Sequence, residues 1–233
     1  MSSSLPRRAV LGAGAAFALP GGTAHASDLS FPATRLTRAA LKLLDRTQSP
    51  ALRNHSLRSF LFARAATPHR DYDTEVVFLI CALHDMGLTK EGSTDHQRFE
   101  IDGADFAARF LESRGVTDGR VDTIWDAIAL HTSAGFHDSP VFARRRAPEI
   151  RIAQRGIGID LTGPAPLPPG YGDRVNAAHP RLGGLRTLTK AMVDQGLKDP
   201  RKAPAMTLPG EIIHQLHPEL PYDYWTLDND WND

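Results

Sequence analysis

Residues 74–87 read TEVVFLICALHDMG, and this stretch decides the fold. Residues 76–83 are all apolar, which is typical of an element that is buried on every side. The valines also permit a strand. The length of the stretch, the acidic first turn that contains Glu75, and a glycine stop at Gly87 favour a helix. We therefore predict a central buried helix over residues 74–86.

The rest of the chain also reads as helical, because its apolar residues recur with a period of 3.6. Longer helices are expected from residue 36 onward and over residues 51–66, 98–114, 121–131 and, more weakly, 147–159. A long connection rich in Pro and Gly follows at residues 161–184, and connections of this length are often functional. Two short helices are expected near residues 185–195 and 210–216. No run alternates apolar and polar residues as a strand would, so we predict one all-α domain, a single helical bundle with a long loop.

The composition excludes several classes of partner and cofactor. The 27 Lys and Arg residues balance 27 Asp and Glu residues, so charge gives no reason to expect nucleic acid or an anionic membrane. The single cysteine, Cys81, excludes an internal disulfide and a cysteine-based zinc cluster. Ten histidines, together with carboxylates, are then the remaining ligands for a transition metal.

The N-terminus has the pattern of an export signal. The pair Arg7-Arg8 precedes a short, mildly apolar run, and residues 24–26 read AHA, which fits an A-x-A cleavage site. The paired arginines resemble a twin-arginine signal, and the run is shorter than the roughly 20 residues that span a bilayer. A terminus that is never cleaved is the alternative. We expect removal of residues 1–26 and a domain of residues 27–233 that is periplasmic or secreted, without a stable membrane anchor.

The pair His84-Asp85 ends the buried stretch, where an aspartate is costly unless it is paired, hydrogen-bonded or bound to a metal. Adjacent helical residues diverge by about 100°, so both reach one ion only near a helix end. His55 lies on the inward stripe of the preceding helix, far enough upstream for an antiparallel return that places it opposite His84. His131 lies on the inner stripe of a later helix, and Asp160 ends another helical segment. These residues are candidate metal ligands, and the alternative is a capping aspartate with a core histidine.

Four strings around these residues resemble the motifs of one family. They are NHSLRS at 54–59, LHDMGLT at 83–89, RFEIDGA at 98–104 and IALHT at 128–132. In this order they resemble the HD-domain superfamily of α-helical metal-dependent hydrolases, and within it the cyanamide hydratase-like branch, over about residues 36–163. The resemblance implies metal ligands at His55, His84, Asp85 and Asp160.

One position departs from the pattern of HD phosphohydrolases. These enzymes often carry a lysine where this chain has Leu88, and the nearest lysine is Lys90. The absence of a phosphate-gripping lysine from that place counts against phosphomonoesters. A second metal could be proposed at His131 and His137, but Gly135 breaks any fixed helical spacing between them. We therefore predict one divalent metal ion, with zinc as the first choice and iron or manganese as alternatives.

The chemistry follows from a ligand set that leaves a position open for water, which the metal activates. In the hydratases that the chain resembles, this water would add to a nitrile carbon. His131 would move the proton, and Thr132 would orient the substrate. Glu100 and Asp102 are candidates for acid–base work or for supporting a ligand histidine. The alternatives are a core histidine, a helix-cap threonine and a solvated first turn.

Arg58 would share a helix face with His55 and could pair with a buried carboxylate such as Asp102.

Three functions stay open for the chain. The first is a metal-dependent hydratase or hydrolase that acts on a small, neutral, nitrogen-containing molecule such as cyanamide. The second is an HD-type phosphohydrolase acting on a nucleotide or other phosphoester, and the third is a non-enzymatic module that binds a small ligand.

Overall fold

The computed structural model describes residues 29–67, 71–163 and 167–222 of the 233. The chain divides into a unit of residues 1–30 and a unit of residues 31–233, and every helix from α1 onward belongs to the second. The predicted export signal at residues 1–26 lies outside the described residues. Within the described ranges all regular elements are helical, which confirms the predicted all-α fold.

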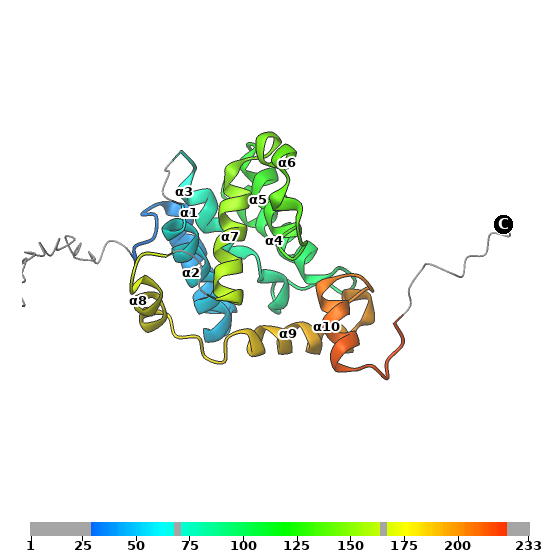
Figure 1. The fold of residues 1–233 in the computed structure, drawn as a ribbon. Coiled ribbons are helices and arrows are strands. Elements are labelled where there is room, and N and C mark those ends of the chain that lie inside the picture. The colour runs from blue at the N-terminus through cyan, green and yellow to red at the C-terminus, as the bar shows by residue number, and fades with distance from the viewer. Residues whose placement is uncertain (1–28, 68–70, 164–166, 223–233) are drawn as a thin grey trace, which may run out of the picture. The chain divides into compact units, whose positions relative to one another are not determined.

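Three helices form the centre of the fold: α2 (Pro50–Ala65), α3 (Thr74–Leu83) and α7 (Pro148–Thr162). Each packs against the other two, and Figure 1 shows α2 and α7 side by side. The predicted central helix is α3, whose residues 76–83 are all buried. Its N-cap is Asp73, whose carboxylate accepts hydrogen bonds from the backbone N–H groups of the first turn. The helix ends at Leu83, earlier than predicted, and a 3-10 turn, η2 (Met86–Leu88), follows.

Other helices cover this centre on two sides. α1 (Arg35–Thr47) packs on α3, while α4 (Phe99–Glu112) and α5 (Arg120–Ala129) pack on each other. The short helix α6 (Pro140–Arg145) was not predicted from the sequence. In Figure 1 these last three helices are green and stand beside α7.

Gly156 allows α2 and α7 to cross closely. A Cβ atom at this position would lie 2.1 Å from the carbonyl oxygen of Ser59 and 2.5 Å from the Cβ atom of Ala63. Both atoms belong to α2, so any larger residue at 156 would push the two helices apart. The crossing is therefore set by one glycine.

Gly87 also owes its place to a close approach, because a Cβ atom there would lie 2.0 Å from the carbonyl oxygen of Phe99. The sequence predicts a glycine stop at this position, and stop glycines commonly adopt a left-handed conformation. Gly87 has no positive φ and lies inside η2, one turn past the end of α3. Its role is to let η2 contact α4.

The C-terminal part of the domain is more ordered than we predicted. The connection expected to be irregular contains α8 (Tyr171–Ala178), because Tyr171 and Val175 give it a buried face against α2. It is followed by α9 (Leu185–Lys198) and α10 (Leu208–Leu216), which pack together; α9 also contacts η2. None of the described helices is both long and apolar enough to span a membrane.

Candidate metal centre

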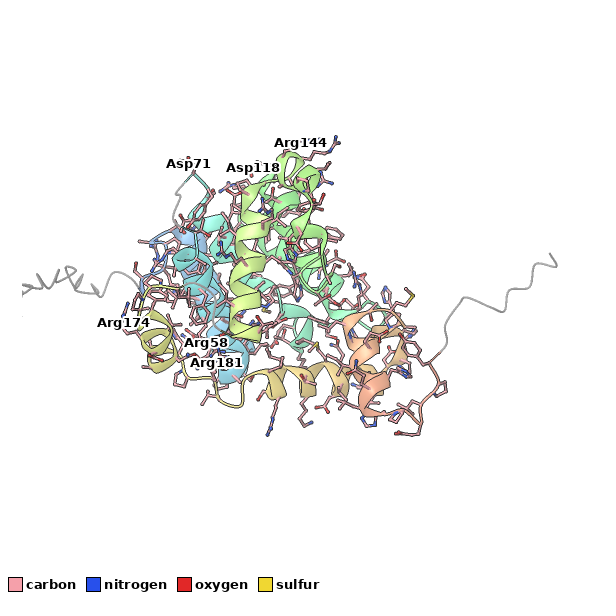
Figure 2. All side chains as sticks on the ribbon, viewed as in Figure 1. Arg58, Asp71, Asp118, Arg144, Arg174 and Arg181 are labelled. Carbon is pink, nitrogen blue, oxygen red and sulfur yellow. The ribbon has the colours of Figure 1, made fainter. Side chains whose placement is uncertain are left out.

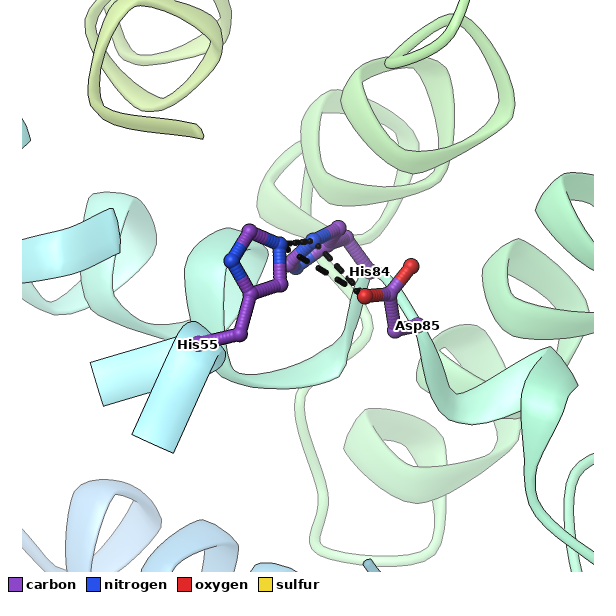
Figure 3. A group of neighbouring side chains, drawn as sticks. All are labelled: His55, His84 and Asp85. Atoms are coloured by element: carbon purple, nitrogen blue, oxygen red, sulfur yellow. Dashed lines mark hydrogen bonds and ion pairs between the residues drawn. The ribbon is translucent and has the colours of Figure 1, made fainter. Parts of the chain in front are cut away.

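Two helices bring three metal-binding side chains to one point. His55 lies on the buried face of α2. His84 is the C-cap of α3, and at Asp85 the backbone leaves the helical conformation, with φ −100° and ψ 14°. This bend lets two adjacent side chains point to the same place, which a continuous helix would prevent. Figure 3 shows the three side chains facing one another.

The donor atoms form a small triangle. His55 Nε2 lies 3.1 Å from His84 Nε2, and Asp85 Oδ2 lies 3.2 Å from His84 Nε2 and 3.6 Å from His55 Nε2. A divalent ion bound at about 2.1 Å separates neighbouring donors by about 3.0 Å in octahedral geometry and about 3.4 Å in tetrahedral geometry. Two nitrogens and one carboxylate oxygen at these separations fit one such ion.

Hydrogen bonds behind the triangle fix the two histidine rings. His84 Nδ1 donates to the carbonyl oxygen of Cys81 at 2.9 Å, and His55 Nδ1 donates to Asp160 Oδ2 at 2.7 Å. Because both acceptors lack a proton to give, each Nδ1 carries the hydrogen. Nε2 is therefore the atom of each ring that is directed at the centre, and it is the atom with which each ring, when neutral, would bind a metal.

Asp160 lies behind His55, on the side of the ring opposite Nε2, and this differs from the expectation that it is a fourth ligand. Its Oδ2 accepts from His55 and from Arg58 Nη2, at 2.7 and 2.8 Å. Its Oδ1 accepts from Arg58 Nε at 2.7 Å and from Arg181 Nη2 at 3.0 Å. With both oxygens occupied in this way, Asp160 orients His55 and is not one of the three donors.

Arg58 pairs with Asp160. This differs from the expected pairing with Asp102. The guanidinium is almost fully buried and also donates to the carbonyl oxygens of His179 and Pro180. Figure 2 shows Arg58 and Arg181 near each other at one end of the domain. The two arginines tie the chain that follows α8 to the back of the metal centre.

Burial and neighbouring charges set the protonation of these groups. Burial lowers the pKa of His55 and keeps this ring neutral, against the hydrogen bond to Asp160. Burial also opposes the charges on His84 and Asp85, but their mutual attraction raises the pKa of His84 and holds that of Asp85 well below its ordinary value. Burial likewise opposes the charge on Asp160, yet hydrogen bonds from His55 and Arg58 lower its pKa to about 2. Both carboxylates are therefore ionised at neutral pH.

His131 stands next to the triangle. Its Nε2 lies 3.7 Å from Asp85 Oδ1, and its ring meets those of His84 and Phe99 edge to face. Its Nδ1 donates to the carbonyl oxygen of Ile128 at 2.6 Å. The Nδ1 atom therefore carries a hydrogen, and Nε2 is the ring atom that faces Asp85 and the centre.

Glu100, which is buried, pairs with Thr132, which is partly exposed, beside His131. The Thr132 hydroxyl donates to Glu100 Oε1 at 2.5 Å. Glu100 is fully buried, and its Oε2 has no hydrogen-bond partner among the described residues. The alternative of a solvated first turn therefore does not describe Glu100.

Asp102 is occupied elsewhere. Its carboxylate accepts from Lys202 Nζ at 2.6 Å and from the hydroxyl and backbone N–H of Thr94 at 2.5 and 3.0 Å. Asp102 and Lys202 are both buried, so this is a structural ion pair that joins α4 to the segment before α10. The expectation of acid–base work or ligand support by Asp102 does not fit these contacts.

A cavity of about 400 Å³ opens onto the triangle. The three donors, His131 and Thr132 lie along its wall, together with the side chain of Leu88. The rest of the lining is apolar except for Thr189: Phe99, Ile157, Leu161, Leu185, Leu188, Met192, Leu208 and Ile212. No Lys or Arg is among the described residues that line it.

Comparison with known proteins finds an HD domain at residues 52–157. This domain implies metal-dependent hydrolase-type activity, and it contains the three donors as well as Glu100, His131 and Thr132. A search of curated proteins found no match. The HD domain confirms the broader resemblance drawn from the motifs, whereas the cyanamide hydratase-like branch stays a prediction.

Several residues of the site were not found from the sequence. Lys202 and Arg181 lie 100 and 21 residues from the carboxylates they pair with, Asp102 and Asp160. The apolar wall supplied by α9 and α10 was also missed, because these helices are far in sequence from the metal donors that they face. Only a rule that every buried carboxylate needs a partner could have signalled the two cations.

Proposed function

We propose that this protein is a metal-dependent hydratase or hydrolase that uses activated water on a small, neutral, nitrogen-containing molecule of the cyanamide type. The observation that carries the proposal is the pairing of a His-His-Asp triangle with a cavity wall that lacks cationic side chains. The triangle supports a reaction with water, and the wall argues for an uncharged substrate.

A phosphoester substrate fits this wall poorly. A phosphate brings one to two negative charges, which proteins hold with fixed cations. Leu88 lies in the wall where HD phosphohydrolases often have lysine, while Lys90 is exposed and lines a different cavity. The phosphohydrolase alternative thus lacks the groups it needs near the donors.

The bound metal would supply an activated water and polarise the substrate. Two histidines and an aspartate suit zinc first, with iron or manganese as alternatives. His131 accepts a proton through Nε2, because its Nδ1–H is held by Ile128, and can return that proton to the substrate nitrogen. In hydration of cyanamide, the carbon gains the oxygen and the nitrogen gains the protons, so that urea forms.

Thr132 favours substrates that donate hydrogen bonds. Its only hydroxyl proton is directed to Glu100, so the oxygen offers an acceptor to the cavity that it lines. An NH₂ group matches this acceptor, whereas a carboxylate or phosphate oxygen does not. Glu100 acts through Thr132 and is a positioning residue.

The metal centre is tested by metal analysis of purified protein. We expect His84→Ala and Asp85→Ala each to lose the metal while keeping most of the helical circular dichroism signal. The matched controls are His96→Ala and Asp122→Ala, which change exposed residues that belong neither to the centre nor to the cavity and should keep a full equivalent of metal. Retention of a full equivalent by either site variant would show that the centre is assigned wrongly.

The activity is tested by assaying urea formation from cyanamide with fully metallated protein, beside phosphate release from nucleoside monophosphates. We expect urea and little phosphate. Ready cleavage of nucleotides without turnover of cyanamide would establish the phosphohydrolase alternative. Metal binding without turnover of either substrate class would favour the binding module.

We also propose that the protein acts after export, in the periplasm or outside the cell. The support is the sequence pattern of residues 1–26, with Arg7 and Arg8 ahead of the apolar run. Replacing both arginines by lysine should leave unprocessed protein in the cytoplasm. Normal appearance of a chain that begins at Ser27 would indicate the general secretory route.

A further inference from the structure

We infer that the natural substrate is larger than cyanamide: it carries a small nitrogen-containing reacting group on an apolar body, and α9 and α10 hold that body. This inference rests on the proposed function for the reacting group at the metal donors. It adds the chemical class of the rest of the substrate.

The first observation is the size of the cavity. Its volume is about 400 Å³. A water molecule occupies about 30 Å³, so cyanamide, counted as three heavy atoms of that size, would fill roughly a quarter of this space. Pockets of this volume normally enclose ligands of drug-like size. A site evolved for cyanamide alone would leave most of an apolar cavity filled with poorly bonded water.

The second observation is the distribution of polar groups. His55, His84, Asp85, His131 and Thr132 gather at the metal donors, and all of them come from residues 52–157. Six lining residues come from α9 and α10, outside that range, and five of these are apolar: Leu185, Leu188, Met192, Leu208 and Ile212. The HD domain therefore supplies the chemistry, while the C-terminal helices supply an apolar wall that selects the substrate.

The third observation is the path from the interior to solvent. Leu188 and Met192 are each 7% exposed, whereas Leu185 and Leu208 are 51% and 39% exposed and form the mouth. Leu185 also lines a neighbouring groove with Leu216, which is 57% exposed. An apolar ligand that covered these leucines would remove further apolar surface from water, which favours binding. An apolar body would extend from the donors past Met192 toward this mouth.

The test measures binding of unbranched primary amides, from acetamide to octanamide, to the fully metallated protein by calorimetry. Each added methylene that enters the cavity should tighten binding by about fourfold until the cavity is filled. Met192→Trp should shorten or abolish this increase of affinity with chain length, because the larger side chain fills part of the cavity. Leu197→Trp is the control, because Leu197 is on α9 but is exposed and does not line this cavity.

A Leu185→Glu variant provides a second test that does not disturb the interior, since Leu185 is half exposed. It should weaken the longer amides and leave acetamide unchanged. Equal affinity for all chain lengths in the wild type would overturn the inference. If that occurred while cyanamide was converted to urea, the proposed function would stand. If the chain-length trend appeared while no nitrile was turned over, the apolar pocket would stand and the proposed reaction would fall.

Discussion

Gly156→Ala is expected to damage both the stability of the fold and the metal centre. The new Cβ atom would lie 2.1 Å from the carbonyl oxygen of Ser59, and real Cβ atoms essentially never come closer than 3.0 Å to such neighbours. α2 and α7 must therefore separate by roughly 0.9 Å at their crossing. Overpacking of this kind costs about 1–3 kcal/mol and occasionally more, and backbone contacts place this case at the upper end.

The separation of α2 and α7 should also weaken the hydrogen bond that orients His55, one of the metal donors. Asp160 lies one turn after Gly156 on α7, and His55 lies one turn before Ser59 on α2. Their 2.7 Å hydrogen bond spans the same interface. Loss of such a partner of a metal-binding histidine typically weakens metal affinity by about 10- to 100-fold. Weaker metal binding should therefore accompany the loss of stability.

The assay is thermal unfolding followed by circular dichroism, together with a metal-binding titration. For a domain of this size, a loss of about 3 kcal/mol lowers Tm by roughly 6–12 °C. Gly158→Ala is the matched control, because it lies on the same helix and its Cβ would meet nothing within 4 Å. It should raise stability by about 0.5–1 kcal/mol. Equal Tm values for the two variants would refute the close crossing of α2 and α7.

Three further outcomes are expected. Asp160→Asn should lower the free energy of unfolding by on the order of 2 kcal/mol near neutral pH, because the pKa of Asp160 in the folded protein is lowered to about 2. The ionised carboxylate contributes this stability in full above its unfolded pKa near 4, and the contribution is lost as the pH falls toward 2. The gap between variant and wild type in urea unfolding should thus narrow below pH 4, and an unchanged gap at pH 2 would contradict the ionised pairing. Lys202→Met leaves the buried carboxylate of Asp102 without its cation and should lower the free energy of unfolding, measured in urea, by about 3–5 kcal/mol. The control Lys198→Met changes an exposed lysine and should alter this free energy by less than about 0.5 kcal/mol. Leu88→Lys should not raise the rate of urea formation from cyanamide, and a faster variant would argue against the neutral-substrate reading of the cavity.

The sequence by itself determined the fold class and pointed to His55, His84 and Asp85, together with Asp160, as candidate metal ligands. Residues 76–83 are apolar on every side and specify a buried central helix, which the structure confirms as α3. A buried His-Asp pair at the end of that helix needed compensation, and the motif order predicted His55 as the opposing ligand. The buried helix and its His84-Asp85 pair are local in sequence, since they depend on periodicity and on adjacent residues, whereas His55 was identified from the order of the motifs.

Tertiary structure alone decided which carboxylate has which role. Asp85, Asp102 and Asp160 are similar in sequence terms, because each lies near a helical stripe or helix end. Their partners decide their roles: Lys202 neutralises Asp102, whereas Arg58 and Arg181 hold Asp160 behind His55. These cations come from distant segments, and only the folded chain brings them into contact.

The substrate wall was also decided by tertiary structure. The stretch of residues 161–184 reads as irregular, yet a buried tyrosine and valine give it a helix, α8. α9 and α10 then follow, and Leu185, Leu188 and Leu208 on these helices line the cavity that opens onto the donors. Hydrophobic burial is not directional, so the pattern of these leucines shows that they are to be buried but not which surface they cover. The motifs therefore predicted a metal site, whereas the shape of the cavity depended on how the C-terminal helices pack.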